Sequence, residues 1–283
     1  MSRADEIIDR VKQIAPLPQA ALQLMRVIEN PDHSVMDIVR VCESDPALTT
    51  NILKVVNSAA FGLRQPVATL ERAVSFLGNK MVGSIALSVS LGKAYDQDLS
   101  GYESERGMLW KHSVCAAIAA RELAMLAKFP VEPQVAYIAG LLHDLGKTVL
   151  SEFLEGETST LVEYITEDRY EDFLDAEKES LGISHAEVGR VLGKHWNLPP
   201  PLVAAMAFHH HPAEADEQWR PLVYVVHLGD LVAMLEGSST GADALLYHLD
   251  KDYDQFVSLD RESLDRIIVT VLSDFERTKA LFS

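Results

Sequence analysis

Signals that begin and end helices recur along the whole chain, and they limit the fold more than any other feature of the sequence. Ser34 and Asp37 have the spacing of a capping box, and Asp45 offers a cap followed by proline at the first helical position. Thr69 can cap another helix, which Gly78 would end. We find no convincing runs of alternating Val, Ile and Thr bounded by tight turns, which would indicate strands. The sequence therefore predicts an all-α protein.

The pattern divides the chain into two helical halves and a short C-terminal part. At 283 residues the chain is long enough for one large or two small domains. A polar, charged stretch at residues 96–107 marks a weak boundary, and every candidate functional residue lies after it. We expect an N-terminal helical half at 1–100, a helical bundle that carries the site at 101–238, and a loop and helix packing on the bundle at 239–283.

The charge and the cysteines limit the partners and the compartment. The formal net charge is −17, and since a nucleic-acid binder needs a basic face, we expect no nucleic-acid partner. A small anionic ligand in a locally basic pocket remains compatible with this charge. The acidic run at 152–179 fits either a solvated helix surface or a docking face for a basic partner. Cys42 and Cys115 lie in apolar helical patterns, which predicts buried, unreactive thiols in a reducing compartment.

The N-terminus is charged and has no apolar signal core. The longest apolar run, around residues 81–91, is too short to cross a bilayer. We therefore expect a cytoplasmic protein with no membrane partner.

The pair His143-Asp144 stands within the apolar stretch 139–147. A buried carboxylate without a partner costs on the order of several kcal/mol, so both side chains need partners. A His-Asp dipeptide is uninformative by itself, because so short a motif occurs by chance. Its placement is informative: we expect the pair in the middle of a helix, with both side chains able to reach an ion between helices.

Two further residues, His112 and Asp230, fall on apolar helical faces. His112 is followed at helical spacing by small alanines, which would let another helix approach closely. Asp230 shares a stripe with Val226 and Met234, where a carboxylate should be paired, neutralised or bound to metal. A satisfied core histidine, or a hydrogen bond between the two, would also explain this placement. Together with His143-Asp144, we interpret these residues as metal ligands.

Three more histidines could hold a second ion. His185 follows Ser184, which forms a capping box with Glu187, so His185 lies in the first turn of a helix. His209 and His210 end a helix, where they could instead complement the helix dipole. Imidazole and carboxylate ligands suit Fe, Mn, Co, Ni or Zn, so we expect one or two divalent ions of this group.

Lys147 lies one turn after His143 and could contact a phosphate; the alternative is a surface lysine. Two metal ions can clamp the attacking and leaving oxygens of a phosphoester. The Gly-rich phosphate-binding loops and the Gly-x-Ser-x-Gly nucleophile turn are absent from the sequence. Metal-dependent chemistry is therefore the one catalytic class that the residues favour.

The order His112, His143-Asp144, Asp230 resembles the signature of the HD metal-dependent phosphohydrolase superfamily. This resemblance implies an HD-type helical bundle in which these residues hold a divalent metal for phosphate-ester hydrolysis. His185 and His209-His210 resemble the extra ligands of the HD-GYP branch, which hydrolyses cyclic diguanylate. The Gly-Tyr-Pro element of that branch is missing after His210.

The fuller resemblance is to the HDOD domain, the HD-related output domain of bacterial signalling proteins, and it spans roughly residues 10 to 235. It rests on separated motifs that occur in order, namely Pro16-Leu17-Pro18, Asp45-Pro46-Ala47-Leu48-Thr49, Val56-Asn57-Ser58-Ala59-Ala60-Phe61 and Ala73-Val74-Ser75-Phe76-Leu77-Gly78. The resemblance implies a regulatory role through contacts with other signalling proteins. Family members often have eroded ligand sets, whereas this chain keeps every candidate ligand.

Three functions follow as hypotheses. The first is a bacterial signal-transduction module that acts through protein contacts and holds a divalent metal. The second is a metal-dependent phosphohydrolase that acts on a nucleotide or cyclic nucleotide. The third keeps the metal purely as a structural link between helices. A ligand set alone does not make a catalyst, because an open coordination position and a substrate pocket are also needed.

Overall fold

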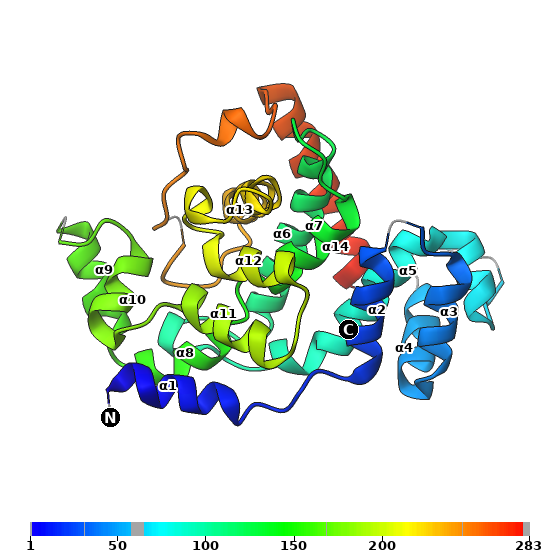
Figure 1. Cartoon of the computed structure of the whole chain (residues 1–283), viewed down its shortest axis with the longest axis horizontal. Coiled ribbons are helices and arrows are strands. Elements are labelled where there is room, and N and C mark those ends of the chain that lie inside the picture. The colour runs from blue at the N-terminus through cyan, green and yellow to red at the C-terminus, as the bar shows by residue number, and fades with distance from the viewer. Residues whose placement is uncertain (1, 31, 58–64, 168, 245, 280–283) are drawn as a thin grey trace.

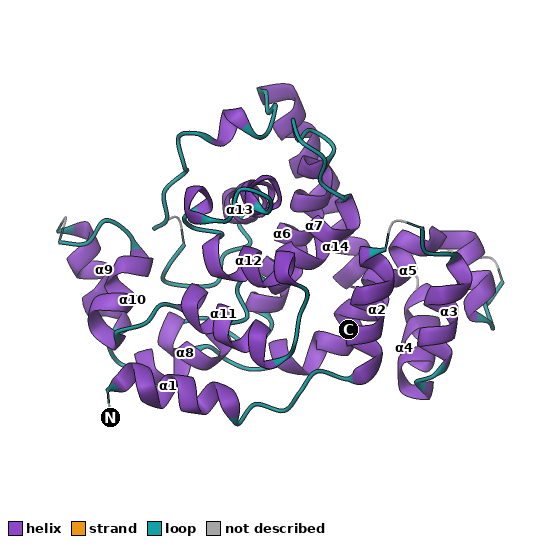
Figure 2. Cartoon of the chain, viewed as in Figure 1, coloured by secondary structure: helices purple, strands orange, loops and turns teal. Residues whose placement is uncertain are grey.

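The computed structural model describes residues 2–30, 32–57, 65–167, 169–244 and 246–279. Within these ranges the regular structure is helical, joined by turns and loops, with two isolated β-bridges and no strand (Figure 2). The all-α prediction is confirmed. None of the described helices is both long and apolar enough to span a membrane.

Several helices of the N-terminal half form a lobe at the right of Figure 1. Ser34 and Asp37 form the predicted capping box, Asp45 caps the next helix through the amide of Leu48, and Thr69 accepts from Arg72. The motif residues Ser58 to Phe61 lie outside the described residues. The lobe consists of α2 (Gln19–Glu29), α3 (Val35–Glu43), α4 (Pro46–Val56) and the first part of α5 (Leu70–Tyr95).

Helix α5 connects the lobe to the rest of the molecule. Gly78 interrupts it with φ 80° and ψ 157°, a conformation that favours glycine, so the predicted helix end is present and a second helical segment follows it. That segment ends at Tyr95, whose buried hydroxyl donates to the carbonyl of Leu141. The second segment of α5 is thereby hydrogen-bonded to the last turn of α7 (Pro133–Leu142), directly before His143 and Asp144.

Helix α1 (Arg3–Lys12) lies away from this lobe (Figure 1). It packs on α8 (Lys147–Leu154) and α11 (His185–His195), in the half that carries the candidate ligands. Ile7 and Val11 are buried there, and Arg3 and Arg10 form ion pairs of 2.9 Å with Glu157 and Glu152. Helices from before and after the predicted boundary at 96–107 therefore pack together in one unit.

The second half is organised around α6 (Met108–Ala124), which packs between α7 (Pro133–Leu142) and α13 (Arg220–Leu235). Small residues let α7 and α13 approach α6 closely, as the alanines in the sequence of α6 indicated. A Cβ atom on Gly140 would lie 2.8 Å from Ala117 Cα, and one on Gly229 would lie 2.9 Å from the Ala116 carbonyl oxygen. The other helices of this half include α9 (Thr158–Thr166), α10 (Phe173–Leu181), α12 (Pro200–Phe208) and α14 (Arg261–Lys279).

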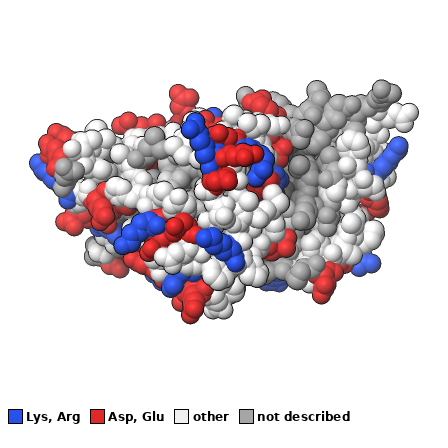
Figure 3. All heavy atoms as spheres, turned by 90° about the horizontal axis from the view of Figure 1, so that it is seen from above, with Lys and Arg blue, Asp and Glu red and all other residues white. Residues whose placement is uncertain are grey.

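Charged residues are mixed on the face drawn in Figure 3, where no continuous basic patch forms among the described residues. Within the acidic run at 152–179, Glu152 is half exposed, in agreement with a solvated surface. Glu177 is fully buried, so the surface interpretation is wrong for this residue. It lies on the apolar face of α10, one turn from Phe173 and Leu181.

Candidate metal centre

The His143-Asp144 pair lies in a turn between two helices, so the prediction that it stands mid-helix is wrong. Helix α7 ends at Leu142 and α8 begins at Lys147. Gly146 allows this turn to pack on the start of α11, because a Cβ atom there would lie 1.9 Å from the His185 carbonyl oxygen. In this turn Asp144 lies close both to His112 and to His185.

The first cluster joins three distant parts of the chain. His112 Nε2 lies 3.0 Å from Asp230 Oδ1 and 3.4 Å from Asp144 Oδ2, and His143 Nε2 lies 3.6 Å from each of these two oxygens. All four side chains are almost completely buried. The residues predicted as the primary ligand set therefore converge.

The outer nitrogens of the two rings determine where the lone pairs point. His112 Nδ1 donates to the Ser238 carbonyl and His143 Nδ1 to the Gly140 carbonyl, both at 2.7 Å. A carbonyl only accepts, so each Nδ1 carries the hydrogen and each neutral ring has its lone pair at Nε2. The two Nε2 atoms are 3.3 Å apart. Two facing lone pairs repel, and a cation between them, either a metal or a proton, removes the conflict.

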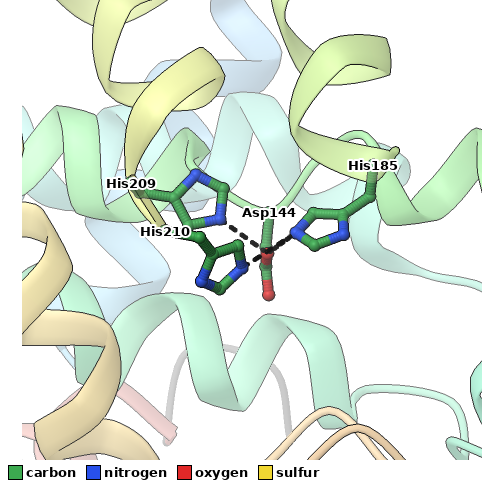
Figure 4. Close-up of side chains that lie close together, drawn as sticks. All are labelled: Asp144, His185, His209 and His210. Carbon is green, nitrogen blue, oxygen red and sulfur yellow. Dashed lines mark hydrogen bonds and ion pairs between the residues drawn. The ribbon is translucent and has the colours of Figure 1, made fainter. Parts of the chain in front are cut away.

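A second cluster forms on the other side of Asp144 (Figure 4). Asp144 Oδ1 lies 3.5 Å from the Nε2 atoms of both His185 and His209, and His185 Nε2 lies 3.0 Å from His210 Nε2. Both His209 and His210 point inward, which the sequence left open. His210 also stacks on the ring of Tyr247, with centroids 3.8 Å apart.

The buried polar atoms of this second cluster suit a metal ion. Asp144 Oδ1, His209 Nε2 and His210 Nδ1 are buried and have no hydrogen-bond partner. Burial lowers the pKa of His209 to about 4, so its imidazole is neutral and able to bind a metal at ordinary pH. Unpaired buried polar atoms are costly, and imidazole and carboxylate donors match divalent transition metals.

Asp144 is common to both clusters, because Oδ2 faces the first and Oδ1 faces the second. Burial would raise the pKa of Asp144, but other effects, of which the charge of Lys147 is the largest, outweigh it and hold the pKa well below its usual value. An ionised carboxylate between two groups of imidazoles is suited to bridge two ions. The residues that would hold the ions are His112, His143, Asp144, Asp230, His185, His209 and His210.

Lys147 is only 2% exposed, so the surface alternative is wrong. Its ammonium lies 2.7 Å from Asp144 Oδ2, 2.6 Å from Asp243 Oδ2 and 2.9 Å from Thr240 Oγ1. An ammonium has three hydrogens, and three acceptors surround it. The suggested phosphate contact stays a prediction, and it would require one of these bonds to be exchanged.

Sequence reasoning missed Glu177, Asp243 and Tyr247, which all lie behind the ligands. Glu177 bonds to His185, Asp243 to Lys147, and Tyr247 stacks on His210 while donating to Asp243 Oδ2 at 2.8 Å. Glu177 could have been found from its place on an apolar helical stripe, as Asp230 was. Asp243 lies in a loop, where no periodicity signals burial.

The comparison with known families agrees with this geometry. The sequence profile of the HDOD domain matches residues 14–212, which is well over half of the chain. The chain belongs to the HDOD family. An uncharacterized protein of Treponema pallidum (strain Nichols) is 33% identical over 238 residues, which make up 83% of this HDOD chain and 45% of that protein. The chain thus spans about half the length of that relative.

Solved structures share the HDOD fold. An HDOD protein of unknown function from Geobacter sulfurreducens aligns with a TM-score of 0.69 at 24% identity, covering 98% of this chain and 91% of that one. A protein of Marinobacter aquaeolei VT8, described as a candidate for signal transduction, gives a TM-score of 0.78 at 22% identity, with 99% and 65% covered. A candidate phosphohydrolase of Shewanella amazonensis SB2B gives 0.62 at 24% identity, with 97% of both chains covered. At these identities the likeness establishes the fold alone.

Proposed function

We propose that this chain is a regulatory HDOD module of a bacterial signalling system, which holds divalent metal at the buried centre and acts through protein contacts. The observation that carries the proposal is the enclosure of the site. Every candidate ligand is at most 6% exposed, and the ammonium of Lys147 is surrounded by protein acceptors. A catalytic metal site keeps an open position for substrate. The description of the Marinobacter structure as a signal-transduction candidate is in line with this role.

A regulatory module needs a route from the metal to a surface that partners can read. The bond from Tyr95 to Leu141 provides a physical contact between the end of α7, next to the ligand turn, and the second segment of α5, whose first segment belongs to the N-terminal lobe. Metal binding that orders the turn would therefore alter the protection of amides in α5. Hydrogen exchange with and without metal tests this, and unchanged exchange throughout α2 to α5 would count against transmission.

The second candidate is a metal-dependent phosphohydrolase for a nucleotide or cyclic nucleotide. It is favoured by the complete ligand set shared through Asp144 and by the likeness to the Shewanella candidate phosphohydrolase. Bound divalent ions would supply Lewis-acid activation of a phosphoester. The chain's own residues would position the ions, and Lys147 would have to release one partner to meet a phosphate.

One experiment separates these functions. Elemental analysis of the purified chain should find divalent metal, and His143→Ala and Asp230→Ala should lose it while His248→Ala, an exposed control, retains it. The metal-loaded protein is then assayed with a broad panel of phosphoesters. Metal without hydrolysis supports the regulatory module, hydrolysis abolished by His143→Ala supports the enzyme, and absence of metal overturns both.

A further inference from the structure

Glu177 is a fully buried carboxylate between a metal ligand and a tyrosine. Its Oε2 accepts from His185 Nδ1 at 2.7 Å and from the His185 backbone N–H at 2.8 Å. Its Oε1 accepts from the Tyr102 hydroxyl at 2.5 Å. Each carboxylate oxygen is thus bonded, and the carboxylate is held against the ring that faces the second cluster.

The other histidines of the site have a different kind of partner. Nδ1 of His112 and of His143 bonds to a carbonyl oxygen, and Nδ1 of His209 lies 3.2 Å from the carbonyl oxygens of Ala205 and Met206. His210 Nδ1 has no hydrogen-bond partner and lies 3.8 Å from Asp230 Oδ2. Among the candidate ligands described, His185 is the one whose outer nitrogen is hydrogen-bonded to a carboxylate. A carboxylate acceptor fixes the tautomer and increases electron density on the metal-facing nitrogen more than a neutral carbonyl does.

The two clusters also differ in the charge available to a cation. The first cluster contains Asp230 and one oxygen of Asp144. The second contains three imidazoles and the other oxygen of Asp144, whose charge is also shared with Lys147. A divalent ion at the second cluster therefore has less negative charge in direct contact. Glu177 supplies the missing charge from behind His185, in a buried setting where solvent screens it little.

We propose that Glu177 is the positioning residue that makes the second ion bind, by orienting His185 and balancing the charge of the cluster formed by Asp144, His185, His209 and His210. This inference rests on the proposed metal binding. It adds that the ion at the second cluster depends on a buried acid, Glu177, that does not itself contact the ion. Tyr102 contributes by holding the second oxygen of the carboxylate. Its own carbonyl accepts from the Ala242 N–H at 2.8 Å, which ties the arrangement to the loop after α13.

The test is a Co²⁺ titration of the metal-free full chain, followed by the visible absorption of the bound ion and by elemental analysis. Wild type should bind two ions. Glu177→Gln keeps the shape and an acceptor for His185 Nδ1 but removes the charge, so the second ion should bind about 10- to 100-fold more weakly while the first is unaffected. Tyr102→Phe should weaken the same ion to a smaller extent.

Glu187→Gln is the matched control. Glu187 lies on the same helix as His185 and bonds to Ser184 rather than to an imidazole, so the variant makes the same change in net charge and should retain both ions. Two ions bound by Glu177→Gln with wild-type affinity would overturn the inference, as would equal weakening of both. If Glu177→Gln fails to fold, Tyr102→Phe decides by the same criterion. A wild-type chain that binds no Co²⁺ would instead overturn the proposed function.

Discussion

His112 Nε2 faces His143 Nε2 across 3.3 Å, while the opposite nitrogen of each ring donates to a backbone carbonyl. The carbonyls fix the tautomers, so the two lone pairs point at one another in a buried space. Asp230 and Asp144 add negative charge within 3.6 Å of the same atoms. This geometry is unfavourable without a cation, either a proton or a metal ion, and it is one of the physical arguments for the proposed metal binding.

The two clusters should lose their ions separately. We expect His112→Gln to lose the first ion and keep the second, and His210→Gln to do the reverse, since each ring belongs to one cluster. Asp144→Asn should lose both, because its two oxygens face different clusters. Metal per chain after dialysis, measured by elemental analysis, distinguishes these outcomes. Loss of both ions in every variant would contradict the separation.

The buried ion pair of Lys147 should be important for folding. Lys147→Met leaves Asp144 and Asp243 buried with less compensation, and we expect the free energy of unfolding to fall by about 3–5 kcal/mol. Adding Asp243→Asn removes one of the stranded charges, so the double variant should be more stable than Lys147→Met. Urea unfolding of the metal-free proteins measures both.

Lys12→Met is the control for this comparison, because Lys12 pairs with Asp9 on the surface and should contribute at most about 1 kcal/mol. If Lys12→Met and Lys147→Met lowered the free energy of unfolding by the same small amount, the buried pair would contribute no more to stability than the surface pair.

Gly146 and Gly189 should respond in opposite ways to alanine. A Cβ atom at Gly146 would lie 1.9 Å from the backbone oxygen of His185, so Gly146→Ala must displace the start of α11 and should cost about 1–3 kcal/mol. At Gly189 the nearest atom is Met206 Cβ at 3.5 Å, an ordinary contact. Gly189→Ala should therefore be neutral or stabilise the helix by about 0.5–1 kcal/mol. Thermal unfolding compares the pair, and equal destabilisation would refute the packing argument.

Both cysteines should resist alkylation in the folded protein. Burial raises the pKa of Cys42 and of Cys115 to about 12, so almost no thiolate forms at neutral or mildly alkaline pH. We expect iodoacetamide at pH 8 to label urea-unfolded protein rapidly and native protein far more slowly. The native rate should rise with pH as the thiolate fraction increases. Mass spectrometry identifies the labelled residue, and rapid native labelling of either one would contradict its burial.

Local features of the fold were predictable because they depend on neighbours three or four residues away. The capping boxes at Ser34 and Ser184 form as predicted, as does the cap at Thr69. Asp230 could be singled out because a carboxylate on an apolar helical stripe is visible in the sequence. The prediction of a continuous helix through His143 was wrong, because the chain turns where Gly146 packs on α11. That contact joins segments about forty residues apart in the sequence.

The sequence alone determined that the chain is helical, where several helices begin, and which residue types could serve as ligands. Only the tertiary structure decided that the two oxygens of Asp144 face different clusters. It also decided that Lys147 forms an ion pair with Asp243 and that Glu177 accepts a hydrogen bond from His185. Caps and stripes follow from short-range hydrogen bonds and helical periodicity, which the sequence displays directly. The partner of a buried charge depends on how helices that are far apart in the sequence pack against each other. The spacing of residues along the chain does not reveal which of them come into contact.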